Sequence, residues 1–422
     1  MSFTDDTTTN KQRILTVIRF TMLHTLIFLL LFLTLGHLFY PAPGALEFHF
    51  ARQILDGMIP YRDFLFEYPP LALPVFFLPA LILDTYPAYS VSFALEMLFF
   101  DILLMVLITL LASHIKIPVK RALTVYTLLL IVTGPIVIAR FDLLPAMLVV
   151  AALWAFSRGK NLITWSLLAF GVTAKLYPVI IVPLIALYLL RNRQFLKLAG
   201  GCVSFITTLV ILNLPYYLLS PGGFISSFTY HTARGLQCES FYASIVLILK
   251  ILGKAEVKSA FSYGSWNLVS PLADSFAGAS FYVTAVLLCA IYAHYAWAIW
   301  RMPATHLTSE GIPVKETKLI IGYTALVVIT FMVTGKVFSP QYLIWLFPLL
   351  PLIKSKWSAT VWLIFAIIGI ITQYIFPYKY VDYESFQTFY VLLLAFRNFI
   401  IPVLAVFIML PGNTSRSTMN TD

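Results

Sequence analysis

The chain has 422 residues, of which 60% are hydrophobic, 16% aromatic and only 11% charged. Soluble globular proteins carry roughly 45–50% apolar and about 25% charged residues, and disordered chains are poor in aromatic residues. Both classes are therefore excluded, and the composition is typical of a polytopic membrane protein. The formal net charge is +10, but no run of five basic residues exists, so the charge does not by itself indicate nucleic-acid binding.

Apolar runs along the chain predict a bundle of membrane helices. A helix needs about 20 apolar residues to cross about 30 Å of hydrocarbon, and only helices or closed barrels satisfy their backbone there. We predict an all-α membrane protein with about 11 to 13 transmembrane helices. The runs lie at residues 14–39, 88–112, 122–138, 143–157, 162–174, 177–190, 198–219, 276–300, 319–334, 341–353, 358–376 and 388–410.

The distribution of Lys and Arg predicts the orientation, because these residues accumulate in short cytoplasmic loops. Most of them fall on one side when residues 1–13 and the tail 411–422 are placed in the cytoplasm. Two long segments, 40–87 and 220–275, then lie outside the cytoplasm. Loops longer than about 12–15 residues are usually functional or disordered, and these two are rich in aromatic residues. We therefore expect any chemistry on the extracytoplasmic side.

The first outer segment, GALEFHFARQILDGMIPYRDFLFEYPPLALPVFFLP, carries several charges. A helix is expected to start near Glu47 and to break at Gly57–Pro60, and residues 71–83 should form a juxtamembrane or re-entrant element. The charges are either solvated residues that pair locally or one carboxylate cluster at the water–lipid boundary. Those residues are Glu47, Arg52, Asp56, Arg62, Asp63 and Glu67.

Two motifs follow at outer helix ends. In ARFDLLPA, Arg140 and Asp142 either neutralise each other or leave Arg140 to bind an anionic group, since guanidinium suits phosphate oxygens. In AKLYP, Lys175 and Tyr177 lie at a break between two apolar runs. An ionisable residue within the membrane is a functional candidate, although a lysine can also snorkel to the headgroups.

The second outer segment contains FTYHTARGLQCESFYAS, with His231, Arg234 and Glu239 close together, and residues 241–258 are expected to form an interfacial helix. Further along, TGKVFSPQYLIWLFPLLP places Lys336 and Gln341 either in a polar site or in a plain turn with interfacial aromatic residues. Three ionisable residues within helices are expected to pair with one another and to be structural: Glu96, Asp101 and Arg397.

Carboxylates and cations thus converge on the outer side, and two of the cations lie at the depth of lipid phosphates. Transfer of a group from a lipid-linked phosphate needs this combination. A carboxylate takes the proton from an attacking hydroxyl, and Arg or Lys stabilises the charge that builds on the departing phosphate.

The blocks GMIPYRDFLFEYPPLALPVFFLP, ARFDLLPAMLVVAALWAFSRG, AKLYP, YHTARGLQCES and FSPQYLIWLFPLLP occur in this order along nearly the whole chain. In this series the chain resembles the bacterial members of glycosyltransferase family 87, within the GT-C superfamily. The resemblance implies a GT-C-type bundle that uses a polyprenyl-phosphate sugar, typically mannose, and inverts the anomeric centre. It also implies a catalytic carboxylate in the first outer loop.

Family members open that loop with an Asp followed three residues later by Tyr, and the matching positions here are Glu47 and Phe50. We rank Glu47 first as the base, Asp63 second and Glu67 third. The residues expected to contact the donor phosphate or the substrates are Arg62, Arg140, Asp142, Lys175, Tyr177, His231, Arg234, Glu239, Lys336 and Gln341.

The predicted function is transfer of a hexose, with mannose as the expected sugar, to a hydroxyl of a glycan or glycolipid outside the cytoplasm. The expected location is the plasma or inner membrane of the cell envelope, with no nucleic-acid partner. No cofactor is required, and a divalent metal beside the carboxylates is not indicated. Two alternatives stay open, a transporter or lipid flippase and a ligase or polymerase that acts on lipid-diphosphate-linked glycans.

Overall fold

The computed structural model describes residues 3–35, 44–82, 85–303 and 311–410. The predicted tail 411–422 and the first residues of the outer segment, 40–43, lie outside the described residues. The helices of the described chain are α1 (Phe3–Leu35), α2 (Ala45–Leu55), α3 (Ala72–Ile82), α4 (Tyr86–His114), α5 (Val119–Thr133), α6 (Ile136–Ala139), α7 (Leu143–Ser157), α8 (Asn161–Ala174), η2 (Tyr177–Ile181), α9 (Val182–Arg191), α10 (Phe195–Leu219), α11 (Pro221–Ala233), α12 (Phe241–Ile251), α13 (Pro271–Trp300), α14 (Val314–Thr334), η3 (Pro340–Tyr342), α15 (Leu343–Leu346), η4 (Leu350–Leu352), α16 (Ser358–Gln373), η5 (Tyr374–Tyr378), α17 (Tyr380–Glu384) and α18 (Thr388–Met409).

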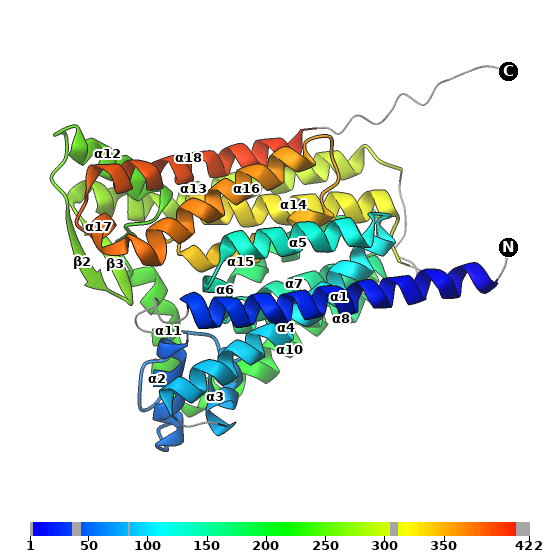
Figure 1. The fold of residues 1–422 in the computed structure, drawn as a ribbon, viewed down its shortest axis with the longest axis horizontal. Coiled ribbons are helices and arrows are strands. Elements are labelled where there is room, and N and C mark those ends of the chain that lie inside the picture. The colour runs from blue at the N-terminus through cyan, green and yellow to red at the C-terminus, as the bar shows by residue number, and fades with distance from the viewer. Residues whose placement is uncertain (1–2, 36–43, 83–84, 304–310, 411–422) are drawn as a thin grey trace.

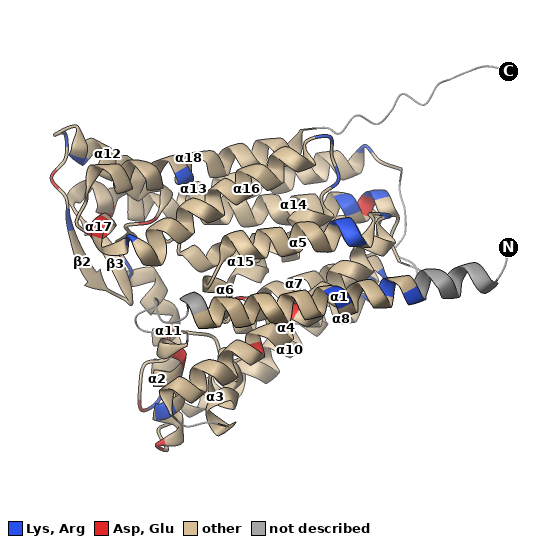
Figure 2. Ribbon diagram, in the orientation of Figure 1, with Lys and Arg blue, Asp and Glu red and all other residues tan. Residues whose placement is uncertain are grey.

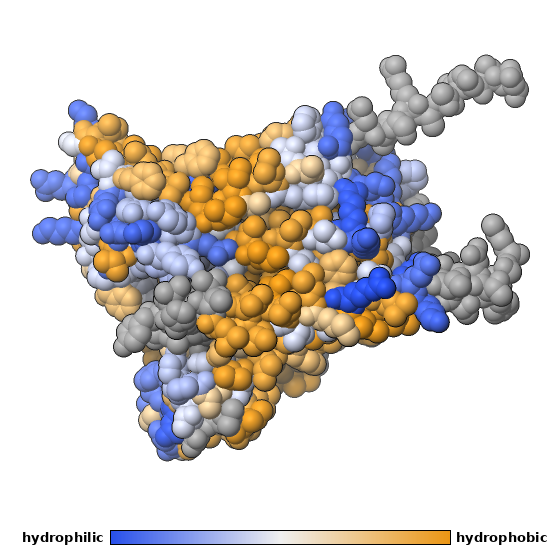
Figure 3. Space-filling model, viewed as in Figure 1, coloured by the Kyte–Doolittle hydropathy of each residue, from blue (hydrophilic) through white to orange (hydrophobic). Residues whose placement is uncertain are grey.

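Seven of the described helical stretches are long and apolar enough to cross a membrane, and they belong to α1, α4, α10, α13, α14, α16 with η5, and α18. Shorter apolar helices, among them α7, α8 and η2 with α9, pack between them. Figure 3 shows an apolar band that separates two hydrophilic ends, as expected for a surface that lies in hydrocarbon. The prediction of an all-α, multi-pass membrane protein is confirmed.

The two ends of the bundle differ in charge. At one end, where α1 begins and α18 ends, lie the short loops that carry most of the lysines and arginines (Figures 1 and 2). We call it the basic end; it includes Lys116, Lys318 and Lys354, whose charges act on one another, and Arg158, which acts on His114 at the end of α4. The other end, the loop end, carries α2, α3, α11, α12 and α17 and the only sheet of the described chain.

Two helix breaks present polar residues at the loop end. Helix α5 stops at Gly134, whose φ of 67° suits glycine, and Pro135 then starts the four-residue α6. Arg140 follows in an extended conformation. Similarly, α8 ends at Ala174, and Lys175 is extended (φ −159°, ψ 134°) before Pro178 enters the first turn of η2. The predicted break at Ala174–Pro178 is therefore confirmed.

Residues 241–258 differ from their prediction as one helix, because only their first part is helical. Helix α12 ends at Ile251, and Gly253 (φ 68°) turns the chain away. Strand β2 (Lys258–Ser262) then pairs antiparallel with β3 (Ser265–Val269), and β3 pairs with β1 (Leu236–Gln237), which gives the order β1-β3-β2. Lys250 therefore lies in α12, Lys254 in the bend that follows it and Lys258 at the start of β2.

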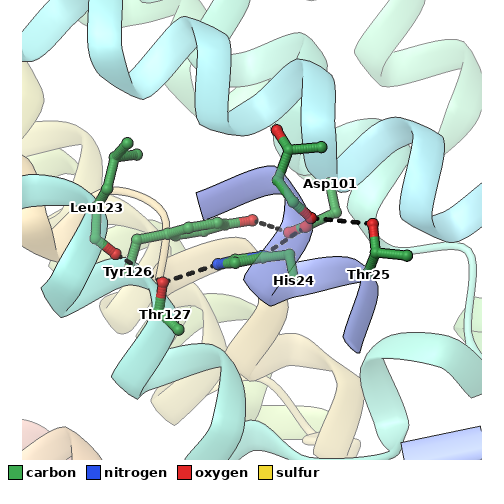
Figure 4. Close-up of polar contacts among 7 residues, drawn as sticks. His24, Thr25, Asp101, Leu123, Tyr126 and Thr127 are labelled. Atoms are coloured by element: carbon green, nitrogen blue, oxygen red, sulfur yellow. Dashed lines mark hydrogen bonds and ion pairs between the residues drawn. The ribbon is translucent and has the colours of Figure 1, made fainter. Parts of the chain in front are cut away.

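Inside the bundle, a buried network joins α1, α4 and α5 (Figure 4). Asp101 accepts a hydrogen bond of 2.6 Å from the Tyr126 hydroxyl on one oxygen and lies 2.6 Å from His24 Nδ1 with the other. His24 Nε2 lies 2.8 Å from the Thr127 hydroxyl, which donates to the Leu123 carbonyl. Because few side chains of α1 are buried, this network supplies the polar anchor of that helix.

The expected mutual pairing of the three intrahelical charges is wrong. Asp101 belongs to the network just described, whereas Arg397 donates to the carbonyl of Glu239 at 2.9 Å and lies over the ring of Phe338. Glu96 takes part in no ion pair with either of them. Their location within helices predicted that these residues pair inside the bundle. The sequence does not give the rotation of each helix, and this rotation decides the partner.

Candidate active site at the loop end

Two ion pairs lie side by side at the loop end. Arg140 Nη1 lies 3.4 Å from Glu47 Oε1, and Lys175 Nζ lies 2.6 Å from Asp142 Oδ1. Arg140 and Asp142 therefore do not neutralise each other, although only one residue separates them. The extended backbone of Arg140 sends its side chain to α2, while Asp142 starts α7 and faces Lys175.

The carboxylates of this site are enclosed and the cations reach outward. The side chains of Glu47 and Asp142 have no exposed surface, whereas 31% of Arg140 and 16% of Lys175 is exposed. Burial raises the pKa of the Glu47 carboxyl above its ordinary value, and the charge of Arg140 offsets part of that rise. Asp142 Oδ2 is buried without a hydrogen-bond partner among the described residues.

Aromatic rings surround Lys175 and hold Asp142. The indole Nε1 of Trp345 donates a hydrogen bond of 2.6 Å to Asp142 Oδ1, and Trp345 is stacked between Tyr177 and Tyr342 with ring centroids 4.1 and 3.9 Å away. Lys175 Nζ lies 5.0 Å from the ring centre of Phe141 and 5.4 Å from that of Trp345. These cation–π contacts fix the ammonium group beside the bundle end.

Glycine packing joins the two long outer segments. The carbonyl of Tyr61, a residue with a φ of 65°, lies so close to Gly223 in α11 that a Cβ at Gly223 would overlap it. The Tyr61 hydroxyl donates to the Tyr68 carbonyl at 2.6 Å, which closes the PYRDFLFEY turn. Next to it, His231 Nε2 lies 2.9 Å from the Glu67 carbonyl. Helix α11 therefore holds residues 56–70, which we call the acidic loop, in place.

Of the two readings left open for the first outer segment, local pairing on the surface holds for Asp56 and Asp63. Asp63 accepts hydrogen bonds of 2.8 and 2.9 Å from Arg62 and another from the Ile59 backbone N–H, at an exposed turn. The Arg62 guanidinium holds the pKa of the Asp63 carboxyl below its ordinary value. Asp56 pairs likewise with Arg52 on the surface. Only Glu47 and Glu67 face the other site residues.

The second outer segment completes the wall of the site. Arg234 Nε donates to the Ser265 hydroxyl at 3.2 Å, and Lys336 Nζ donates to the Thr232 carbonyl at 2.7 Å. Glu239 is buried one layer deeper, where it accepts a hydrogen bond from Gln237 and where burial raises its pKa to about 7. Gln341 is half-buried at the start of η3.

The charges of both segments act on one another. The pKa of the Tyr68 hydroxyl is well above its ordinary value, first because the residue is buried and then because Glu67 and Glu47 lie close. Burial lowers the pKa of His231, and the charges of Arg234 and Lys175 lower it further. Segments more than 100 residues apart in sequence thus form one electrostatic site. The sequence pattern predicted only that these segments lie on the same side of the membrane.

An apolar pocket adjoins this polar site. Its volume is about 390 Å³, and its wall comes from the acidic loop, α8, α10 and α11. Leu176, which follows Lys175, lines it, and Pro69 brings it next to Tyr68. Several lining residues are exposed, so the pocket opens onto the surface of the bundle; they are Leu176, Val210, Leu214, Tyr217 and Phe228.

Sequence reasoning missed several contributors. One of the two open readings of TGKVFSPQYLIWLFPLLP made Trp345 an interfacial aromatic residue, but Trp345 is buried and donates a hydrogen bond to Asp142. Gly223 and Phe141 were not singled out at all. A run of apolar residues does not indicate which aromatic side chain turns toward a polar site. A glycine in the sequence does not indicate which backbone segment packs against it.

The chain was compared with protein families, curated proteins and solved structures. No protein-family model matches the chain, and no curated protein matches it. Two chains of solved structures match. One is the crystal structure of ArnT from Cupriavidus metallidurans bound to undecaprenyl phosphate, with a TM-score of 0.47 and 12% sequence identity, over 93% of this chain and 76% of that chain. A likeness at this level assigns neither a family nor an activity to the chain.

Proposed function

We propose that the protein is a membrane glycosyltransferase of the GT-C type that transfers a hexose, with mannose as the expected sugar, from a polyprenyl-phosphate carrier to a hydroxyl of a glycan or glycolipid. The observation that carries the proposal is that two partly exposed cations lie at the same end of the bundle as an apolar pocket, whose wall includes Leu176, the residue after Lys175. An isoprenoid chain suits the pocket, and a phosphate suits the cations.

Arg140 and Lys175 are the proposed phosphate ligands. In the structure both cations pair with buried carboxylates, Glu47 and Asp142. A phosphate group at this place would compete for both cations, since charge-assisted bonds to phosphate oxygens are strong. Glu47 would then be released from Arg140 at the moment when the donor is bound. His231, Arg234, Lys336 and Gln341 supply further substrate contacts in the proposal.

Glu47 is the proposed general base. The acceptor oxygen forms a bond to the anomeric carbon, the bond from that carbon to the phosphate oxygen breaks, and polyprenyl phosphate leaves with the electron pair. The acceptor proton goes to the Glu47 carboxylate. Its raised pKa makes this carboxylate a better proton acceptor than an ordinary glutamate. Displacement in one step inverts the anomeric configuration.

The orientation of the protein is also part of the proposal. Because Lys and Arg prefer cytoplasmic loops, the basic end should face the cytoplasm and the loop end the extracytoplasmic side of the plasma or inner membrane. Single cysteines at the exposed positions Asp56 and Lys254, with Cys202, Cys238 and Cys289 replaced by serine, test this with a membrane-impermeant maleimide. Labelling of intact cells at both positions is expected; labelling only after lysis would reverse the orientation.

Activity is tested with the purified full-length protein, polyprenyl-phosphate mannose and glycan acceptors. Glu47→Gln should lower the transfer rate by roughly 10²- to 10⁴-fold, because it removes the base. Asp63→Asn is the matched control in the same loop, since Asp63 already pairs with Arg62 at an exposed turn, and it should keep nearly full activity. Equal activity of both variants would contradict the assignment of the base.

Two further readouts address the donor and the metal. Transfer from a lipid-diphosphate-linked glycan, without transfer from the monophosphate lipid, would favour a ligase or polymerase instead. The proposal assigns the positive charge at the leaving phosphate to Arg140 and Lys175. Dialysis against EDTA should therefore leave the transfer rate unchanged, and a loss that Mg²⁺ or Mn²⁺ restores would contradict this.

A further inference from the structure

The tip of the β2–β3 hairpin carries an aromatic residue in an unusual backbone conformation. Tyr263 has a φ of 51° and Gly264 a φ of 68°, so the two residues form a turn in which both have positive φ. Asn, Asp and Gly are the residues that such turns prefer, because other side chains are strained there. A tyrosine at the first position therefore suggests that its side chain is retained for a reason other than the turn.

The turn is held rigidly. The side-chain amide of Asn267 donates hydrogen bonds to the Ser262 carbonyl at 2.8 Å and to the Ser262 hydroxyl at 3.0 Å. Ser265, at the start of β3, accepts a hydrogen bond from Arg234 of the proposed active site. The hairpin tip is thus fixed to the site and not free to swing.

The two faces of the hairpin have different surroundings. Phe261 and Trp266 are cross-strand partners on one face, and Leu268 of the same face packs in the core beneath α12. Because side chains alternate along a strand, Ser265 and Asn267 belong to the opposite face, which is the polar face that contacts Arg234. Tyr263, 39% exposed, lies in the turn between the strands, where it contacts Tyr230, a residue on which the charge of Arg234 also acts.

Helix α11 separates this hairpin from the apolar pocket. Phe224 and Phe228 line the pocket, whereas Tyr230 follows Phe228 by two residues and so projects about 200° away around the helix. The Tyr230 ring packs edge-on against Tyr263 with centroids 5.1 Å apart. Its pKa is raised because the residue is half-buried and because its hydroxyl interacts with the Glu67 side chain. The hairpin and the pocket therefore reach the same acidic loop from opposite sides of α11.

We propose that the hairpin tip is the acceptor subsite and that the exposed face of Tyr263 packs against a sugar ring of the acceptor. This inference rests on the proposed function, in which the pocket takes the lipid donor and leaves the other side of α11 for the acceptor. A sugar ring presents an apolar C–H face and a rim of hydroxyls. These two features match an exposed aromatic ring at the tip of a hairpin whose Ser265 hydroxyl is bound by Arg234.

The test measures binding of methyl α-mannoside, methyl β-glucoside and methyl N-acetyl-β-glucosaminide to the full-length protein in detergent by saturation-transfer NMR. The variants are Tyr263→Asn, which suits the positive φ but lacks the ring, and Tyr263→Phe, which keeps the ring. Tyr263→Phe should bind like the wild type, and Tyr263→Asn should bind at least one sugar about tenfold more weakly. Absence of binding to the wild type, or equal binding by Tyr263→Asn, would overturn the inference.

Binding of undecaprenyl phosphate, followed by tryptophan fluorescence, separates this inference from the proposed function and also reports folding of each variant. Sugar binding that depends on the Tyr263 ring, without binding of the lipid phosphate, would support the subsite and contradict the donor. Lipid binding and glycosyl transfer with an acceptor KM that Tyr263→Asn does not change would contradict the subsite alone. A higher acceptor KM with an unchanged donor KM is the expected result.

Discussion

The bundle contains two buried polar clusters that differ in how completely their members are satisfied. In the network of Figure 4, both nitrogens of His24 and both oxygens of Asp101 have partners, and both side chains are fully buried. At the loop end, Asp142 Oδ2 and the Tyr177 hydroxyl have no partner among the described residues, and Arg140 and Lys175 are partly exposed. A closed network holds helices together, whereas an incomplete one next to a pocket is suited to bind a ligand.

The largest expected effect sharpens this comparison at the loop end. Asp142→Asn should lower the rate of glycosyl transfer by roughly 10²- to 10³-fold, because Lys175 loses the charge that orients it toward the phosphate. Asparagine can still accept the hydrogen bond from Trp345, so the midpoint of thermal unfolding should change little. A variant that loses its fold along with its activity would mean that this ion pair is structural.

The corresponding change in the interior network should have the opposite outcome. Asp101→Asn leaves His24 with a weaker partner in an enclosed site and should lower the free energy of unfolding by about 3 kcal/mol. The transfer rate of the folded protein should stay within about twofold of the wild type, since the network does not contact the site. Thr25 donates a hydrogen bond to the Thr21 carbonyl of its own helix and lies outside the network, so Thr25→Ala is the matched control with little expected effect.

The packing between the two outer segments offers a test with adjacent glycines. Gly223→Ala should destabilise the protein by about 1–3 kcal/mol and lower activity, because its Cβ would overlap the Tyr61 carbonyl and push the acidic loop away from α11. Gly222→Ala is the control, since a Cβ there meets nothing within 4 Å. Chemical denaturation of both variants measures the difference, and equal midpoints would argue against the tight contact.

The smallest expected effect concerns Glu239, whose pKa is raised by burial to about 7 from an ordinary 4.5. Its protonated form is the one that burial favours, so the contribution to stability is fully present below pH 4.5 and is lost as the pH rises through about 7. Relative to Glu239→Gln, the wild type should therefore lose about 2 kcal/mol of stability between about pH 5 and pH 8. Thermal unfolding of the two proteins at both pH values measures this, and parallel curves would contradict it.

The sequence was sufficient for the helices and for the residues that gather at the loop end. Long apolar runs that cross a membrane must be helical, and charged residues within them are costly and therefore candidates for a functional site. The sequence did not predict which side chains pair with each other. Arg140 had a carboxylate two residues away in Asp142, yet it pairs with Glu47, which lies 93 residues earlier. Which of the two it contacts depends on how α2 docks, and no local pattern contains that information.

The small sheet was missed for a related reason. Its strands are five residues long or shorter, and β1 has only two residues. Such short segments show too few alternations to stand out from the apolar background. As a result, Arg234 was predicted from the sequence, whereas Tyr263 and its hairpin were not.

Helix α10 has a consequence for the supply of substrate. Among its described residues only Gly201 is buried, and Val203, Ile206, Ile211 and Leu218 are more than half exposed. In a bilayer this helix is bathed in acyl chains over nearly its whole length, and the apolar pocket begins on its inner side. A lipid substrate can therefore reach the pocket by lateral diffusion within one leaflet, without passing through water. The pace of its arrival would then follow the fluidity of the membrane and not the viscosity of the surrounding solution.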